Sequence, residues 1–182
     1  DPAFLNALKN TLVILLVQVP LMVALATVLA VLLNSSLLKA RGIMRFAFFA
    51  PVVVGEVAYA AVFRLMFTAD RGIVNKMLDS IGLPAIDWFS NPTAAMALII
   101  MAVTWRWAGY NAIIILSGLQ SVPEDVYEAA TLDRVSPLRQ FFFITLPLLR
   151  PVLVFCVVLS VIGTMQLFAE PFLITNRGGP GG

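Results

Sequence analysis

The chain has 182 residues and a formal net charge of +2; 60% of its residues are hydrophobic and only 12% are charged. This apolar share lies well above that of a soluble domain and predicts an integral membrane protein, while the small net charge says little about partners. The chain has no His, and Cys156 is its single cysteine, so an internal disulfide is excluded. The absence of His and the presence of a single thiol disfavour a transition-metal site and a His-based catalytic triad.

Four apolar runs carry the excess hydrophobicity: residues 11–33, roughly 46–67, 93–119, and 151 to roughly 174. Each is about as long as a tilted helix must be to cross a hydrocarbon core of about 30 Å. Lipid cannot satisfy free backbone groups, and the strict alternation of barrel strands is missing. The runs therefore predict an all-α polytopic membrane protein with about four transmembrane helices.

The first apolar run and the connector after it indicate how the chain is oriented. Gln18 and Pro20 lie near the middle of the run, where Pro removes a helical hydrogen bond and favours a kink. Gln18 is interpreted as structural, beside that kink. Lys39, Arg41 and Arg45 follow within a short connector and favour the cytoplasmic side. Because successive helices alternate in direction, residues 121–147 are expected on the same side.

Residues 69–92 are moderately polar and predict a short amphipathic helix at the membrane interface. Gly82 and Pro84 end the pattern, and Trp88 is expected at the level of the headgroups. The third apolar run then begins at the N-cap candidate Asn91, followed by Pro92. The apolar side of the amphipathic helix carries Ile73, Met77, Leu78 and Ile81, and its polar side carries Asn75, Lys76, Asp79 and Ser80.

Residues 121–147 interrupt the apolar pattern and predict two short helices on the membrane surface. Ser121 and Glu124 form a capping-box pattern that starts the first helix, which is expected to run to about Asp133. The Ser136-Pro137 pair starts the second helix, and Pro147 stops or bends it.

The spacing within this segment resembles the EAA motif of the inner-membrane permease subunits of bacterial ABC importers. The tracts LQSVPEDVYEAATLD and QLFAEPFLITNRGGP are similar to those of the carbohydrate branch of that family, and the resemblance covers essentially the whole chain. The residues that carry the motif are Glu128, Ala129 and Ala130, followed at the family's spacing by Ile144, Leu146 and Pro147.

The resemblance implies the type I permease fold of ABC importers, with residues 1–182 as one transmembrane domain and residues 121–147 as its cytoplasmic coupling loop. The implied partners are a second permease subunit, identical or different, two ATPase subunits, an external solute-binding protein and membrane lipid; no nucleic acid is expected. The implied location is the bacterial inner membrane. The chain has no GxxxxGK[ST] phosphate loop, so ATP and Mg are expected on the ATPase and no cofactor on this chain.

The resemblance also implies roles for the coupling residues. Glu128 would pair with a basic group of the ATPase, and Ala129 and Ala130 would let the helix seat closely in its cleft. Arg134 stands where the family has glycine, so it must adopt a left-handed backbone at some cost or end the helix differently. The residues assigned to coupling are Glu128, Ala129, Ala130, Asp133, Arg134, Ile144, Leu146 and Pro147.

Two helical stripes are candidates for a solute pathway. One lies in the third run and is polar and aromatic; the other lies in the fourth run and is small and hydroxylated. Facing each other, they suit a carbohydrate, which stacks on aromatic rings and hydrogen-bonds through its hydroxyls; the alternative is that small residues simply pack helix on helix. The stripes consist of Trp107, Tyr110 and Asn111 in the third run, and of Ser160, Gly163, Thr164 and Leu167 in the fourth.

Ionisable groups in or near the apolar runs are further candidates, because charge at membrane depth is costly. Glu56 and Glu170 can contact a solute or make a hydrogen bond between helices or subunits. Arg106, between Trp105 and Trp107, is interpreted mainly as a residue that snorkels or stacks at an interface.

Two other functions are compatible with these patterns. The same fold can import amino acids, peptides, polyamines or an oxyanion, or the chain can be a membrane enzyme or proton-coupled carrier that uses Glu56 and Glu170. The chain starts at Asp1 and stops at NRGGPGG, so we expect a fragment that lacks flanking helices.

Overall fold

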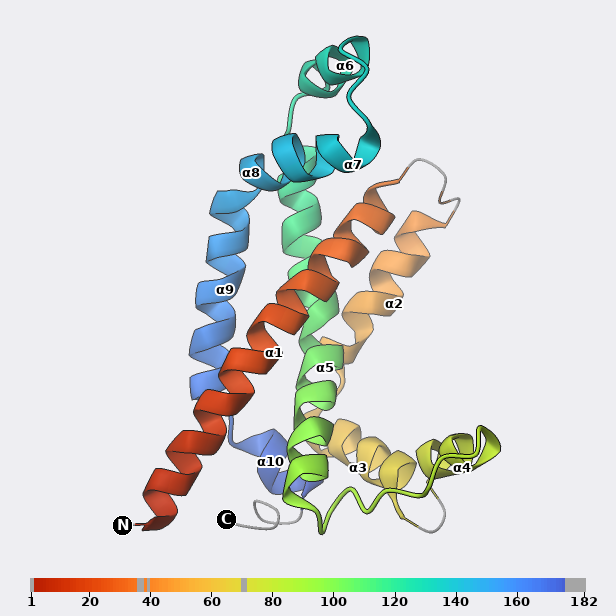
Figure 1. Ribbon diagram of the computed structural model, residues 1–182, viewed down its shortest axis with the longest axis vertical. Coiled ribbons are helices and arrows are strands. Elements are labelled where there is room, and N and C mark those ends of the chain that lie inside the picture. Colours follow the sequence, from red (N-terminus) through yellow and green to blue (C-terminus); the bar gives the residue numbers. More distant parts are fainter. Residues whose placement is uncertain (1, 36–37, 39, 70–71, 176–182) are drawn as a thin grey trace.

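The computed structural model describes residues 2–35, 38, 40–69 and 72–175, and every regular element in these ranges is helical (Figure 1). Lys39 and the end of the QLFAEPFLITNRGGP tract lie outside the described residues. The elements in chain order are α1 (Pro2–Asn34), α2 (Arg41–Val53), α3 (Glu56–Phe67), α4 (Ile73–Ser80), α5 (Pro92–Gln120), α6 (Glu124–Leu132), α7 (Pro137–Gln140), the π-helical η1 (Phe141–Thr145), α8 (Leu146–Leu148), α9 (Arg150–Met165) and α10 (Ala169–Ile174).

Two continuous helices, α1 and α5, are each long and apolar enough to cross a membrane. Helices α2 and α3 together, bent by 98°, and residues 137–148 with α9, bent by 67°, bring the number of spans to four if each bent pair is one span. The all-α prediction is confirmed. The prediction of an uninterrupted helix over residues 46–67 is wrong, because the chain turns sharply between α2 and α3.

The break between α2 and α3 has a local and a distant cause. Val54 adopts an extended conformation with φ −67° and ψ 130°, and Gly55, whose lack of a side chain weakens a helix, follows it. The Val54 carbonyl then lacks its helical partner, and the Arg106 guanidinium donates to it at 3.4 Å. A group from α5 therefore satisfies the backbone that the break exposes.

The fourth apolar run is also divided, between α9 and α10. Pro171 has no N–H, so a continuous helix could not make the bond from residue 171 to the carbonyl of Leu167. The chain instead begins a new helix at Ala169, which places Pro171 in its first turn, where a missing N–H costs little. The fourth apolar run therefore forms two helices, α9 and α10, where a single transmembrane helix was expected.

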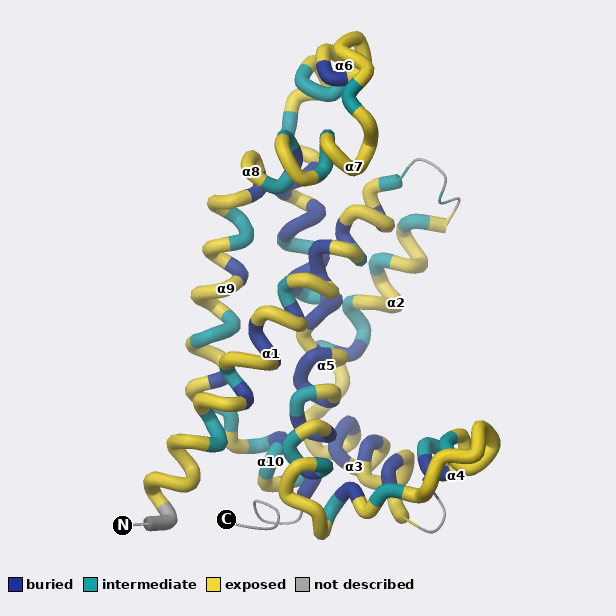
Figure 2. Tube along the Cα trace, viewed as in Figure 1, coloured by how far each residue is buried: buried dark blue, intermediate teal, exposed yellow. Residues whose placement is uncertain are grey.

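The core follows α5, which is buried between α1 and α9 (Figure 2). Small residues on α1 and α5, including Ala26, Ala30 and Ala112, are fully buried and allow the two helices to pack closely. Leu149 and Cys156 contribute the α9 side of the same cluster. A second cluster joins α3, α5, α10 and the loop before α5; it includes Tyr59, Phe63, Phe67, Trp88 and Ile174.

Helix α4 confirms the short amphipathic helix, with one exception. Ile73 and Met77 are exposed apolar residues on one side, as expected for a helix that lies against lipid. Asn75 was assigned to the solvated side, but it is only 5% exposed. Its amide contacts the backbone of Ile86 and its oxygen accepts from the indole N–H of Trp88 at 3.0 Å, so both residues are packed inward rather than placed at the surface.

Candidate functional site

A cavity of about 410 Å³ lies where α1, α3, α5, α9 and α10 meet. All nine residues predicted for the solute pathway line it, so the two stripes face the same space as expected. The structure does not by itself assign them a solute, and their role stays a prediction. These residues are Glu56, Trp107, Tyr110, Asn111, Ser160, Gly163, Thr164, Leu167 and Glu170.

One wall of the cavity is a buried polar network between α1, α5 and α9. Thr164 Oγ1 donates to Gln18 Oε1 at 3.0 Å, and Asn111 Nδ2 donates to the carbonyl of Trp107 at 3.1 Å. Asn111 is 4% exposed, and its Oδ1 atom has no hydrogen-bond partner among the described residues. An unpaired buried acceptor at a cavity wall is a ready position for a donor from a bound molecule.

Aromatic rings form the adjoining surface of the cavity. Trp107 and Tyr110 meet edge to face with centroids 5.8 Å apart, and Phe49 on α2 lies 6.4 Å from Tyr110 on its other side. The contacts hold the two rings in place, and Trp107 remains 36% exposed. Rigid aromatic faces beside amide and hydroxyl groups are suited to a polar, ring-shaped solute.

Glu56 and Glu170 line the end of the cavity nearest α3 and α10, and the buried Arg106 lies beside both. The two terminal nitrogens of Arg106 lie 3.9 Å from the carboxylates of Glu56 and Glu170 respectively. The guanidinium also lies over the ring of Tyr59, 5.0 Å from its centroid. Arg106 is only 6% exposed, so the interpretation that it snorkels to an interface is wrong. Its stacking on aromatic rings was expected, but its two acidic partners were not.

Several lining residues escaped the sequence interpretation. Gln18 was treated as structural; it does bridge to α9, but it also lines the cavity with Met22 from the next turn of α1. A glutamine within an apolar run was the available signal. Gln166 and Phe168 lie in the break between α9 and α10 and also line the cavity. The polarity of Gln166 within an apolar run made it a candidate from the sequence, whereas nothing in the sequence selected Phe168.

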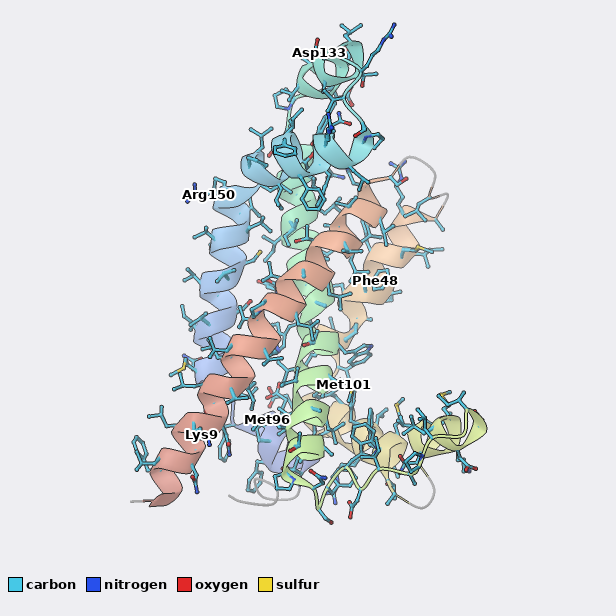
Figure 3. The ribbon with its side chains drawn as sticks, in the orientation of Figure 1. Lys9, Phe48, Met96, Met101, Asp133 and Arg150 are labelled. Carbon is cyan, nitrogen blue, oxygen red and sulfur yellow. The ribbon has the colours of Figure 1, made fainter. Side chains whose placement is uncertain are left out.

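The predicted coupling loop is a separate helical projection at the end of the bundle opposite α3, α4 and α10 (Figure 1). Asp133 lies on its outer part, far from Lys9 at the other end of the molecule (Figure 3). The N-terminal end of α2 lies toward the coupling-loop end, in agreement with the predicted alternation (Figure 1). The first helix, α6, ends at Leu132, close to the predicted boundary.

Most residues predicted for coupling are accessible to a partner, but Ala130 is not. Glu128, Ala129, Asp133 and Arg134 are exposed. Ala130 is 5% exposed and is covered by the loop itself. It therefore cannot offer a small surface to a partner while the loop keeps this structure, and its size serves packing within the loop. Of the remaining coupling residues, Ile144 and Leu146 are half-buried and Pro147 is exposed.

The prediction that Ser121 and Glu124 form a capping box at the start of this loop is wrong. Pro123 precedes α6, without a side-chain cap. The Ser121 hydroxyl donates backward to the carbonyl of Gly118 at 2.8 Å. Ser121 thus satisfies a free carbonyl at the end of α5, which competes with capping the next helix.

Arg134 adopts the left-handed backbone that its position in the motif requires. Its φ is 56°, and among the described residues it is the non-glycine residue with positive φ. The N–H of Arg134 donates to the carbonyl of Thr131, and that of Val135 to Ala130, both at 3.0 Å. These two bonds form a Schellman motif, so the helix ends as it would with glycine, at the steric cost of a side chain.

The second half of the loop returns the chain to the bundle. Helix α7 begins at Pro137 and passes into the π-helical turn η1, and the axis bends before α9 near Pro147 and Pro151. The missing N–H groups of the two prolines favour this bend. The Tyr127 hydroxyl lies 3.3 Å from Thr145 Oγ1 and ties α6 to η1.

The fold and site together define a polytopic membrane protein of the permease class: apolar helices around a polar cavity, with a helical loop projecting from one end. The chain belongs to the family described as the binding-protein-dependent transport system inner membrane component, whose model matches residues 3–181.

Curated relatives are similar over nearly the whole chain. The lactose transport system permease protein LacF of Rhizobium radiobacter is 44% identical over 183 residues, covering 99% of this chain and 61% of the relative. The arabinooligosaccharides transport system permease protein AraP of Halalkalibacterium halodurans is 38% identical, covering 100% and 58%. The sulfoquinovosyl glycerol transport system permease protein SmoG of Agrobacterium fabrum is 35% identical, again covering 100% and 58%. The chain thus spans about three fifths of their length.

Solved structures show the same fold. A bacterial alginate ABC transporter, in complex with an alginate pentasaccharide-bound periplasmic protein, matches with a TM-score of 0.86 at 23% identity, covering 97% of this chain and 62% of that chain. A second structure, of a bacterial ABC transporter involved in import of the acidic polysaccharide alginate, matches with a TM-score of 0.83 at 21% identity, covering 97% and 65%. The chain has the type I permease fold of ABC importers.

Proposed function

We propose that this chain is the transmembrane part of a permease subunit of an ATP-driven, binding-protein-dependent sugar importer, located in the bacterial inner membrane. The observation that carries the proposal is the single cavity onto which the aromatic stripe of α5 and the hydroxylated stripe of α9 both face. The family supports transport, and the similarity to the lactose permease protein LacF and the arabinooligosaccharide permease protein AraP supports a saccharide as cargo.

The chemistry of the cavity wall suits a saccharide. Trp107 offers an exposed ring face for stacking, and Asn111 offers an unpaired acceptor beside it. The Ser160 hydroxyl donates to the carbonyl of Cys156 at 2.6 Å, and the single hydroxyl proton of Thr164 is shared between the carbonyl of Ser160 at 2.8 Å and Gln18 Oε1 at 3.0 Å. Their oxygens retain lone pairs that accept from sugar hydroxyls.

The projecting loop is proposed to couple the cavity to ATP hydrolysis on a separate subunit. Glu128 and Ala129 are exposed on α6 and are the contacts proposed for the ATPase. Tyr127, next to Glu128, bonds to Thr145 in η1, which leads into α9. A displacement of α6 would therefore reach the helix that carries Ser160 and Thr164. The assembly needs a second permease subunit, two ATPase subunits with ATP and Mg, and an external binding protein.

The test is uptake and ATP hydrolysis by the complete transporter in proteoliposomes. Glu128→Ala and Ala129→Asp should each reduce uptake at least tenfold while ATPase activity of the complex persists or falls less. Asp79→Ala, an exposed carboxylate on α4 at the opposite end, is the matched control and should leave both unchanged. Equal uptake by all three variants would overturn the coupling role.

The cargo is tested separately, with the cognate binding protein and labelled solutes. Uptake that sugars do not inhibit, but that amino acids, peptides, polyamines or an oxyanion inhibit, would reject a sugar cargo. Uptake that continues when the ATPase subunits are left out would reject an ATP-driven importer and favour a proton-coupled carrier.

A further inference from the structure

The charged end of the cavity is assembled by two helix breaks. Glu56 is the first residue of α3, directly after the break from α2, and Glu170 lies in the first turn of α10, after the break from α9. Arg106 comes from the unbroken α5 and points one terminal nitrogen at each carboxylate, at 3.9 Å. The breaks thus bring two acidic residues, far apart in the sequence, to opposite sides of one guanidinium.

The two ion pairs leave hydrogen-bonding capacity unused. A separation of 3.9 Å is longer than a hydrogen bond, and the Nε and NH1 atoms of Arg106 have no hydrogen-bond partner among the described residues. The Glu56 side chain is 54% exposed and lines the cavity. Its carboxylate, and that of Glu170 on the same lining, can accept hydrogen bonds from a bound molecule.

An independent observation also points to a bound hydrogen-bond donor. Asn111 belongs to another part of the wall and is 4% exposed, yet its Oδ1 atom has no partner in the described part of the chain. Buried polar atoms are nearly always paired, so this acceptor calls for a donor inside the cavity. Acceptors at both positions fit a molecule that carries several hydroxyl groups.

The charge of the cavity lining disfavours anionic solutes. Glu56 and Glu170 are the charged residues among those that line the cavity, while Arg106 lies behind them, buried. Two negative charges and one positive charge leave this end with a charge of minus one. An anionic solute would meet like charge there, and beside Glu170, whose side chain is only 9% exposed, the repulsion is screened less than in water.

We propose that Glu56 and Glu170, held in position by Arg106, form a hydroxyl-binding subsite that accepts uncharged polyhydroxylated solutes and rejects anionic ones such as uronates. The proposal rests on the proposed function in one respect, that the cavity holds the solute.

The test compares two probes that differ in one group, methyl β-D-glucoside and methyl β-D-glucuronide. Saturation-transfer difference NMR is recorded on the assembled transporter, purified in detergent without ATP. The wild type should bind the glucoside at least about tenfold more tightly than the glucuronide, which corresponds to about 1.4 kcal/mol. In the double variant Glu56→Gln and Glu170→Gln, this preference should fall to about twofold. Glu124→Gln, which replaces a carboxylate on the coupling loop, is the control and should keep the preference of the wild type for the glucoside.

Single variants keep the test informative if the double variant fails to fold or assemble. Glu56→Gln alone changes an exposed side chain, so it should preserve assembly. It should reduce the preference for the glucoside over the glucuronide by a factor of about three. Arg106→Lys keeps the charge but cannot reach both carboxylates, so it should weaken glucoside binding without admitting the glucuronide. Equal binding of the two probes by the wild type, no binding of either, or an unchanged preference in the double variant would overturn the subsite. ATP-dependent uptake, measured after the same transporter is reconstituted into proteoliposomes, tests the proposed function independently.

Discussion

The hydroxyl of Thr164 on α9 donates a hydrogen bond of 3.0 Å to the side-chain oxygen of Gln18 on α1, and the two residues are 3% and 1% exposed. The amide nitrogen of Gln18 has a weaker acceptor, the sulfur of Met22 at 3.3 Å. The Thr164 bond therefore supplies the strong partner of a buried amide and joins two walls of the cavity.

Loss of this bond should destabilise the bundle measurably. Thr164→Val keeps the shape but leaves the Gln18 oxygen without its donor, so we expect a loss of about 1–2 kcal/mol in the free energy of unfolding. Unfolding by SDS in mixed micelles measures it. Thr11→Val is the control, because Thr11 bonds to the carbonyl of Ala7 in the same way but joins no second helix. A double-mutant cycle with Gln18→Leu that showed no coupling would contradict the assignment.

Replacement of Arg134 by glycine should stabilise the coupling loop. The left-handed backbone at φ 56° costs a residue with a side chain about 1 kcal/mol, which glycine avoids. Hydrogen exchange of the α6 amides in the assembled protein should slow in Arg134→Gly. Arg134→Ala removes the charge but keeps the steric cost, so its exchange should not slow. Slower exchange in both variants would assign the effect to charge instead of backbone conformation.

Asn75 should act as the main fastening point of α4 on the bundle. Its amide nitrogen donates to the carbonyls of Ala69 and Ile86 at 3.0 Å and 2.9 Å, and its oxygen accepts from Trp88 at 3.0 Å. Asn75→Ala leaves these buried groups unpaired, and we expect a loss of about 3 kcal/mol in local stability. Protease digestion and the fluorescence of Trp88 should both report loosening. The neighbouring exposed change Lys76→Ala should have no effect, and equal behaviour of the two variants would refute this role.

Gly109 should be intolerant of any side chain, in contrast to Gly163. A Cβ atom at position 109 would overlap the carbonyl oxygen of Phe48 on α2, whereas a Cβ at position 163 meets no atom within 4 Å. Gly109→Ala must push α2 away from α5, at a cost of about 2–3 kcal/mol. Thermal unfolding in detergent should show a lowered midpoint for Gly109→Ala and an unchanged one for Gly163→Ala. An unchanged midpoint for both would mean that α2 moves without cost.

The sequence predicted most helices and the composition of the candidate site. Asn91 caps α5 as expected: its side chain accepts from the N–H groups of Thr93 and Ala94, with Pro92 at the first helical position. The spacing of small and polar residues along α5 and α9 placed both stripes on the cavity, because residues three and four apart share a helix face whatever surrounds it. These features depend on a few neighbouring residues, and the chain encodes them locally.

The break between α2 and α3 and the charged group depend on the tertiary structure. An apolar run of residues 46–67 reads as one helix, because composition does not show that Arg106, 52 residues beyond Val54, donates to the carbonyl freed at the break. In the same way, Arg106 between two tryptophans resembled a surface residue until α3 and α10 brought Glu56 and Glu170 beside it. Composition, periodicity and capping set where helices form. Whether the backbone freed at a break can remain buried, and which polar side chains can remain buried, depends on partners that only the folded chain brings within hydrogen-bonding or ion-pairing distance.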